Sequence, residues 1–133
     1  MKKNRFAAAG CILFGAFLGA ANAETGIRFD AVMMKDGVVV ARPSVWSGFD
    51  QEVAAEVPGL IRFVAEAGVP VNGRSMVKAK FFYFDRGEWR KSWSPEGEML
   101  ITATPSFEYT FPEDKRYRIV LKPRKAERPE DVR

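Results

Sequence analysis

Hydrophobic and polar residues alternate along Ser75–Phe84, the most regular stretch of the sequence. One face of this stretch is apolar throughout (Val77, Ala79, Phe81 and Tyr83), whereas the other begins with lysines and ends with aromatic residues. A period of two is typical of a half-buried β-strand, and aromatic and β-branched residues suit its pleated surface. We therefore predict a central strand here, with its aromatic side chains in the core of a sheet rather than on a ligand platform.

The same alternation recurs along the chain, with turn residues between its copies. Asp36-Gly37 is the strongest hairpin signal. The segment 51–57 would also suit a helix by its Ala and Glu content, but it is too short to form a stable one. The expected strands are 27–34, 38–46, 51–57, 60–65, 75–84, 89–93, 99–104, 107–111 and 116–121. Eight or nine short strands without a convincing helix predict an all-β fold, either a single antiparallel β-sandwich or a small open barrel of about eight strands.

The first 23 residues have the pattern of a secretory signal peptide. They begin with Lys2, Lys3 and Arg5, continue with an alanine-rich apolar run, and end in Ala21-Asn22-Ala23, which fits the small-x-small cleavage pattern. The apolar run is shorter than the ~20 residues that a membrane-spanning helix needs. We therefore expect cleavage after Ala23, no stable membrane anchor afterwards, and a periplasmic or secreted protein.

Removal of residues 1–23 changes the chemistry of the chain. Cys11, the only cysteine, is lost; lipid attachment there is disfavoured because the apolar run continues past it. Three of the 21 basic residues and none of the 17 acidic ones precede Glu24, which leaves 18 basic against 17 acidic residues and a net charge of +1. This balance gives no reason to expect nucleic-acid binding. The remainder is long enough for one domain, and we expect a β-domain over 24–123 and a charged, disordered tail over 124–133.

Few residues are suited to catalysis or metal binding. The sequence contains no histidine, and the chain after residue 23 contains no cysteine. Serine–histidine triads, thiolate nucleophiles and zinc sites therefore cannot be built. Glu96, Glu98, Glu113 and Asp114 fall in predicted turns, where we expect them to be solvated rather than to bind calcium. We predict no catalytic residue, no metal site and no cofactor, and we do not expect an enzyme.

Tryptophan and basic residues interleave after the central strand, in Asp85–Trp93. Tryptophan, tyrosine and arginine are the residues most enriched at binding hot spots. Strand alternation would place Trp89, Lys91 and Trp93 on one face, where they would bind a partner or a planar ligand; alternatively, both tryptophans pack in the core. The predicted binding residues are Arg86, Trp89, Arg90, Lys91 and Trp93.

Two stretches resemble a known family. Val38–Val53 (VVVARPSVWSGFDQEV) is similar to part of the secretin C-terminal region, in which a strand, a proline-containing segment, a turn and a further strand follow one another. Phe107–Pro123 resembles the β-hairpin that follows in such modules. The chain is much shorter than a secretin and has no evident membrane-inserting hairpin. The resemblance therefore implies a stand-alone β-module for assembly or partner binding, and not a pore.

Taken together, these patterns predict a small periplasmic or secreted β-domain that acts as a non-catalytic, protein-binding accessory or assembly factor. Its expected partner is another periplasmic or envelope protein. Two alternatives stay open: a small-ligand or glycan-binding module that uses the aromatic surface, and a hydrolase that works through carboxylates, for which two acidic side chains would have to converge in one pocket.

Overall fold

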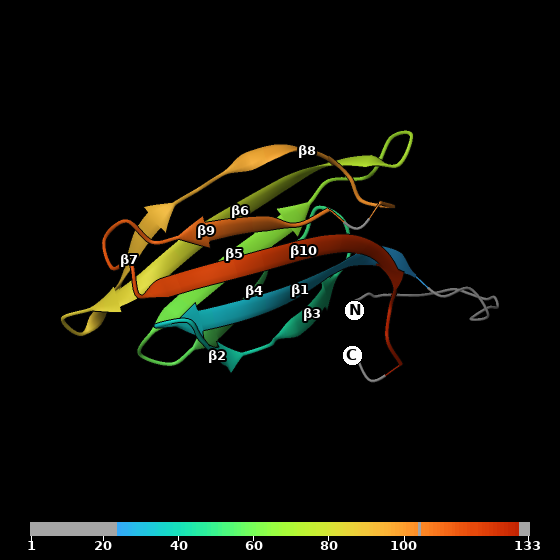
Figure 1. Ribbon diagram of the computed structural model, residues 1–133. Helices are drawn as coiled ribbons and strands as arrows, with labels where there is room; N and C mark the ends of the chain where they lie inside the picture. The colour runs from blue at the N-terminus through green and yellow to red at the C-terminus, as the bar shows by residue number, and fades with distance from the viewer. Residues whose placement is uncertain (1–23, 104, 131–133) are drawn as a thin grey trace.

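The computed structural model describes residues 24–103 and 105–130, and the predicted signal peptide lies outside these ranges. The chain forms two antiparallel five-stranded sheets, which Figure 1 shows as two layers. The strands are β1 (Thr25–Lys35), β2 (Val38–Ala41), β3 (Ser44–Ser47), β4 (Val53–Val57), β5 (Ile61–Ala67), β6 (Arg74–Asp85), β7 (Glu88–Trp93), β8 (Glu96–Leu100), β9 (Phe107–Thr110) and β10 (Tyr117–Glu127). No helix forms within the described ranges, so the all-β prediction is confirmed, and the two sheets are consistent with the predicted sandwich. In that part of the chain, accordingly, no helix has the length and apolar character needed to cross a membrane.

The two sheets are built alike. In the first, β1 pairs with β10, β9 lies beyond β10, and β2 and β3 follow one another along the other side of β1. In the second, β5 pairs with β6, β4 lies beyond β5, and β7 and β8 follow one another along β6. A proline lies at each break, between β2 and β3 and between β7 and β8. The carbonyls of these prolines accept the N–H groups of Ala31 and Ala79 at 2.9 Å, so the central strands stay hydrogen-bonded across the breaks.

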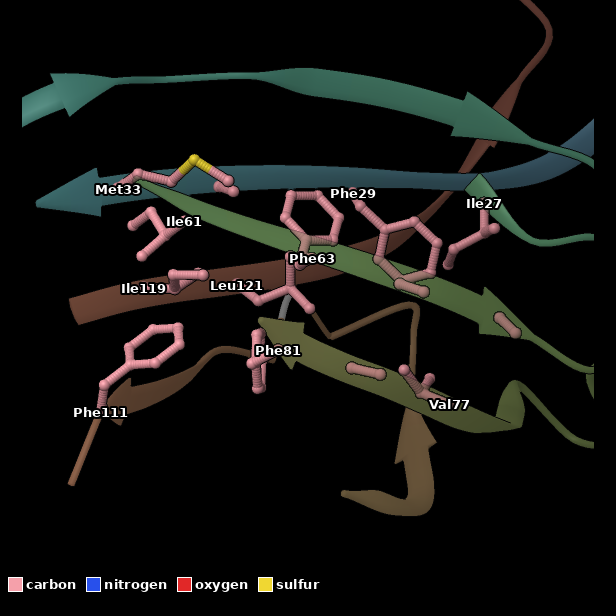
Figure 2. Packing of buried hydrophobic residues seen from close by; sticks show 14 of the residues in the cluster. Ile27, Phe29, Met33, Ile61, Phe63, Val77, Phe81, Phe111, Ile119 and Leu121 are labelled. Carbon is pink, nitrogen blue, oxygen red and sulfur yellow. The ribbon is translucent and has the colours of Figure 1, made fainter. Parts of the chain in front are cut away.

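The core lies between the sheets and follows the predicted alternation. Every second residue is buried in β1 and β5, in β6 as far as Phe81 and in β10 as far as Pro123. Figure 2 shows core side chains from these strands interleaved between the ribbons. The largest fully buried side chains include Phe29, Phe63, Phe81, Phe111, Ile27, Ile61, Ile119 and Leu121. Burial of each such side chain contributes about 1.5–3 kcal/mol before the cost of ordering the chain. The assignment of the central strand to the sheet core is thus confirmed for Val77, Ala79 and Phe81.

Residues with positive φ angles form the tight turns of two hairpins. Asp36 and Gly37, between β1 and β2, have φ angles of 54° and 78°. Both therefore lie in the left-handed region that a two-residue type I′ turn requires. The turn between β6 and β7 has the same form, with φ angles of 52° at Arg86 and 83° at Gly87. Arginine is less suited to this conformation than asparagine or aspartate, so this hairpin is held mainly by the pairing of its strands.

The strand predicted over 99–104 is displaced in the structure. β8 begins at Glu96, within the predicted turn, and the chain leaves the sheet at Ile101. Only Ser94 and Pro95 separate the two segments that pair with β6, so Glu96 and Gly97 already belong to the next strand. Glu96 and Glu98 are consequently strand residues, and the prediction that they lie in a turn is wrong.

The prediction of a disordered tail is wrong at its beginning. Arg124–Glu127 continue β10 opposite Thr25–Arg28. Pro123 does not end this strand because β9 pairs only with Arg118–Leu121. The N–H of Lys125, two residues further, points away from β1 to the carbonyl of Ile101 at 3.3 Å. The nitrogen of Pro123 also points away from β1, to the side on which β9 has already ended. The sheet therefore loses no hydrogen bond because proline lacks an N–H group.

Contacts with β3 and with Glu24 hold the chain as far as Arg128. Trp46 Nε1 donates a hydrogen bond to the carbonyl of Ala126 at 3.0 Å. The Arg128 N–H donates to the carbonyl of Glu24 at 2.7 Å, and its guanidinium lies 3.2 Å from the Glu24 carboxylate. Gly26 allows the indole of Trp46 to pack here, since a Cβ on Gly26 would lie only 2.6 Å from that ring. Residues 131–133 of the predicted tail lie outside the described ranges.

A polar network ties β1, β3 and β10 together on the outer face of the first sheet. Ser44 Oγ donates to Asp30 Oδ1 at 2.6 Å, Arg124 Nε donates to Asp30 Oδ2 at 3.1 Å, and Arg28 Nε donates to Ser44 Oγ at 2.7 Å. Burial raises the pKa of Asp30, but these hydrogen bonds and the charges of Arg28 and Arg124 outweigh it, so the pKa lies below its ordinary value of 3.8.

Replacement of Asp30 by asparagine should therefore lower the free energy of unfolding by about 1 kcal/mol at pH 7, because the ion pairs are partly exposed and screened. A carboxylate whose pKa is lowered in the folded state stabilises the protein above its unfolded-state pKa, and the effect is lost as the pH falls through its folded-state pKa. The difference between the native protein and Asp30→Asn in urea unfolding should thus shrink below about pH 4. Glu52→Gln, which removes only the exposed ion pair of Glu52 with Lys80, is the control. An equal effect for both variants would contradict this role for Asp30.

Candidate functional site

The predicted tryptophan and arginine cluster lies on β7, but a bulge divides it between two faces. Trp93 is opposite Phe81, whereas Lys91 is opposite Phe82, which leaves Ser92 as an extra residue in β7. An extra residue shifts the alternation of a strand by one position. Trp93 therefore shares the inner face with Phe81, and the prediction that it shares a face with Trp89 and Lys91 is wrong.

Trp89 and Lys91 lie on the outer face of the second sheet. The indole of Trp89 packs edge-on against Phe84, with ring centroids 5.2 Å apart. Next to them the guanidinium of Arg62 lies 5.5 Å from the centroid of Phe82. Trp89 is half-buried and Phe84 is 37% exposed, so this surface is an open aromatic patch with basic residues at its margin.

The two arginines of the cluster have local roles. Arg90 is opposite Tyr83, and its guanidinium lies 3.2 Å from Asp85 and 3.7 Å from Glu88. Both carboxylates belong to the same hairpin, so the charge of Arg90 is already neutralised. Arg86 occupies the turn itself and is exposed. Arg90 lies on the same inner face as Trp93, because Tyr83 and Phe81 share that face of β6, but it lies nearer the turn and is paired within the hairpin.

Trp93 is the outermost member of a group of three stacked rings. Its centroid lies 4.9 Å from Tyr109 of β9, and Tyr109 lies 5.1 Å from the buried Phe81, with interplanar angles of 24° and 12°. Ser92 Oγ donates to Glu113 at 2.6 Å and lies 2.6 Å from the Tyr109 hydroxyl. The stack joins the two sheets at one margin of the sandwich, yet Trp93 stays 47% exposed. The alternative that both tryptophans are core residues is therefore wrong for Trp93.

An apolar pocket opens beside this stack, between β8 of one sheet and β9 of the other. We call it the β8–β9 opening. Its volume is about 230 Å³, and its lining consists of Val77, Trp93, Pro95, Glu96, Gly97, Met99, Phe107 and Glu108. This volume is below the 300–1,000 Å³ that is usual for small-molecule sites, so the opening is suited to one side chain or a small fragment.

Gly97 creates much of the opening. It is opposite the buried Val77 and therefore faces the interior. A Cβ built on Gly97 would have no heavy atom within 4 Å, and the φ angle of Gly97 is not among the positive ones. The backbone would thus accept a side chain at this position, and the space in front of it is empty because there is none.

The chain between β8 and β9 is held in place at Ile101. Ile101 is buried, its N–H donates to the carbonyl of Gly73 at 3.0 Å, and its carbonyl accepts from Lys125 at 3.3 Å. Ile101 is thereby bonded to both sheets. In Figure 1, β8 runs along the upper margin of the molecule and β9 lies beside β10. Neither β8 nor β9 has a second pairing partner within residues 24–103 and 105–130.

The sequence did not indicate most residues of the opening. The sequence pattern predicts a turn at Gly97 and only a strand at Phe107. A glycine at an inward position of a strand often marks the close approach of another group, and this is the signal that could have pointed to it. Of the predicted site residues, the structure brings only Trp93 to the opening.

The carboxylates considered as metal ligands are distributed over the surface. Glu96 and Glu98 project from β8, Glu113 accepts from Ser92, and Asp114 is paired with Arg116 at 2.7 Å. Among the described residues, no three acidic or cysteine side chains converge.

The chain matches no protein-family model, no curated protein and no solved structure.

Proposed function

We propose that the chain is a non-catalytic, protein-binding domain, an accessory or assembly factor, and that its partner inserts an apolar side chain into the β8–β9 opening. The observation that carries this proposal is the empty space in front of Gly97, at an inward position of β8 between the buried Val77 and Met99, which packs against the core. An unfilled apolar site of this kind has a cost in stability. A partner that fills it restores the missing contacts and removes apolar surface from water.

The chemistry of the opening favours a protein partner over a glycan. Val77, Met99, Phe107 and Trp93 provide an apolar lining, whereas a sugar would need convergent polar groups. Aromatic anchors near the centre of an interface contribute most of the binding free energy in protein complexes. With the signal peptide predicted over residues 1–23, the partner would be another periplasmic or envelope protein.

A second candidate function follows from the outer aromatic patch. Phe84 and Trp89 present a partly exposed aromatic surface beside Lys91 and Arg62. This is the arrangement expected for a small-ligand or glycan-binding surface, and it lies on the opposite face of the sheet from Trp93. Variants of the two tryptophans therefore separate the two functions.

The test is affinity capture of the partner from an envelope extract with the C-terminally tagged protein. Trp93→Ala should lower the amount of retained partner at least about tenfold, since truncation of a hot-spot tryptophan typically costs 2 kcal/mol or more. Trp89→Ala, with the same change on the other face, should alter retention less than about twofold. Thermal unfolding of both variants shows whether each is folded. Retention that depends on Trp89 and not on Trp93 would overturn the proposal in favour of the outer patch.

A further inference from the structure

We infer that the partner binds as an added β-strand on the free edge of β9, with an apolar residue in the β8–β9 opening and a lysine or arginine beside it. This inference rests on the proposed function and specifies the kind of segment that the opening accepts.

The backbone of β9 is available for pairing on its outer side. The N–H of Phe111 donates to the carbonyl of Tyr117 at 3.1 Å, toward β10. Because N–H and C=O groups alternate in direction along a strand, Tyr109 and Phe107 also face β10, whereas Glu108 and Thr110 face away from it. No pairing partner occupies that side within the part of the chain that the structure describes. Glu108 and Thr110 therefore present a short row of donors and acceptors to an incoming strand.

The opening lies directly beside this row, since Phe107 and Glu108 belong to its lining. A strand added to β9 would extend the first sheet over the mouth of the opening, toward β8. Successive side chains of a strand point to opposite faces. One side chain of the added strand would thus point inward, toward the space in front of Gly97, and the residues on either side of it would point outward to solvent.

The charges around the opening specify those neighbouring residues. The two ionisable residues of its lining, Glu96 and Glu108, are both acidic. Glu98 lies two residues after Glu96 in β8, and Glu113 follows β9 and accepts a hydrogen bond from Ser92. Of these four, only Glu108 has a cation within 4.0 Å in the described ranges, an exposed pair with Arg118 at 3.5 Å. Lys78 is opposite Glu96 on the outer face but does not come within that distance. The uncompensated carboxylates favour a partner segment with lysine or arginine next to its apolar anchor.

The probe for this inference is a library of short random linear peptides, selected on the full protein and counter-selected on Gly97→Val. The enriched peptides should share one large apolar residue, a lysine or arginine adjacent to it, and alternation without proline. Glu96→Lys should weaken their binding at least about tenfold at low salt and less at high salt, because exposed charges are screened. Enrichment of acidic peptides, or of no peptide at all, would overturn the inference.

Backbone pairing is tested on the peptides themselves, which avoids any effect on the fold. N-methylation at alternate residues removes the N–H groups of one side of an extended strand. Methylation of the set that faces β9 should lower affinity at least about tenfold, and methylation of the other set should leave it unchanged. Equal effects of the two sets would overturn strand addition. If the selected peptides bind in the opening without this asymmetry, the strand inference fails while the proposed function stands; if binding does not depend on Gly97 or Trp93, the proposed function fails as well.

Discussion

Replacement of Gly97 by valine is expected to abolish partner binding and to raise the stability of the protein. A valine side chain would occupy the β8–β9 opening, in which nothing lies within 4 Å of the Cβ position. Valine suits a strand, and it removes the extra backbone freedom of glycine in the unfolded chain. We expect the free energy of unfolding to rise by about 0.5–1 kcal/mol, and retention of the partner to fall at least about tenfold.

A graded series makes this prediction specific. Gly97→Ala fills less of the opening than Gly97→Val, so retention should fall in that order while urea unfolding shows no loss of stability. Opposite changes in stability and binding cannot be explained by unfolding of the variants. Full retention by Gly97→Val would show that the partner binds elsewhere on the molecule, and a loss of stability would show that the opening does not have room for a side chain.

Much of the fold was predictable because both sheets are buried on one face only. A half-buried strand has a period of two in its sequence, and this pattern is evident in β1, β5 and β6. Asp36-Gly37 was predictable for a similar reason, since few residues adopt the left-handed conformation of a type I′ turn. These features depend on neighbours in the sequence, and the sequence is sufficient for them.

Features that depend on a neighbouring strand were not predictable. Pro123 would end most strands, but here it lies beyond the end of β9, where its missing N–H is not needed. Arg124–Glu127 have the composition of a tail, but their pairing with β1 holds them in β10. Neither the end of β9 nor the length of β1 can be inferred from the residues around position 123.

The candidate site depends even more on contacts between strands that are distant in the sequence. The stretch Asp85–Trp93 was identified by its tryptophans, and one of them, Trp93, does lie at the opening. The bulge at Ser92 moves Trp93 to the inner face. A serine at that position does not indicate a bulge. Gly97 and Tyr109 contribute to the site from two different sheets, so only the packing of those sheets brings them together.

Replacement of Phe81 by alanine is expected to have the largest effect on stability. Phe81 is fully buried and contacts Tyr109, Phe107, Phe111 and Trp93, with ring centroids 5.1–6.5 Å apart. Loss of a buried phenylalanine removes its transfer free energy and leaves a cavity, which together cost about 3–5 kcal/mol. Since a domain of this size has only about 5–15 kcal/mol of stability in total, this single substitution should remove at least about a fifth of it.

Phe84→Ala is the matched control, because it is the same substitution three residues later on the other face of the same strand. Phe84 is 37% exposed and packs against Trp89, so its loss should cost about 1 kcal/mol or less. Urea unfolding followed by circular dichroism measures both effects, and equal costs would contradict the assignment of Phe81 to the core and Phe84 to the surface. Phe81 supports Tyr109, and Tyr109 supports Trp93. Destabilisation and loss of binding should therefore occur together in Phe81→Ala, whereas Gly97→Val separates them.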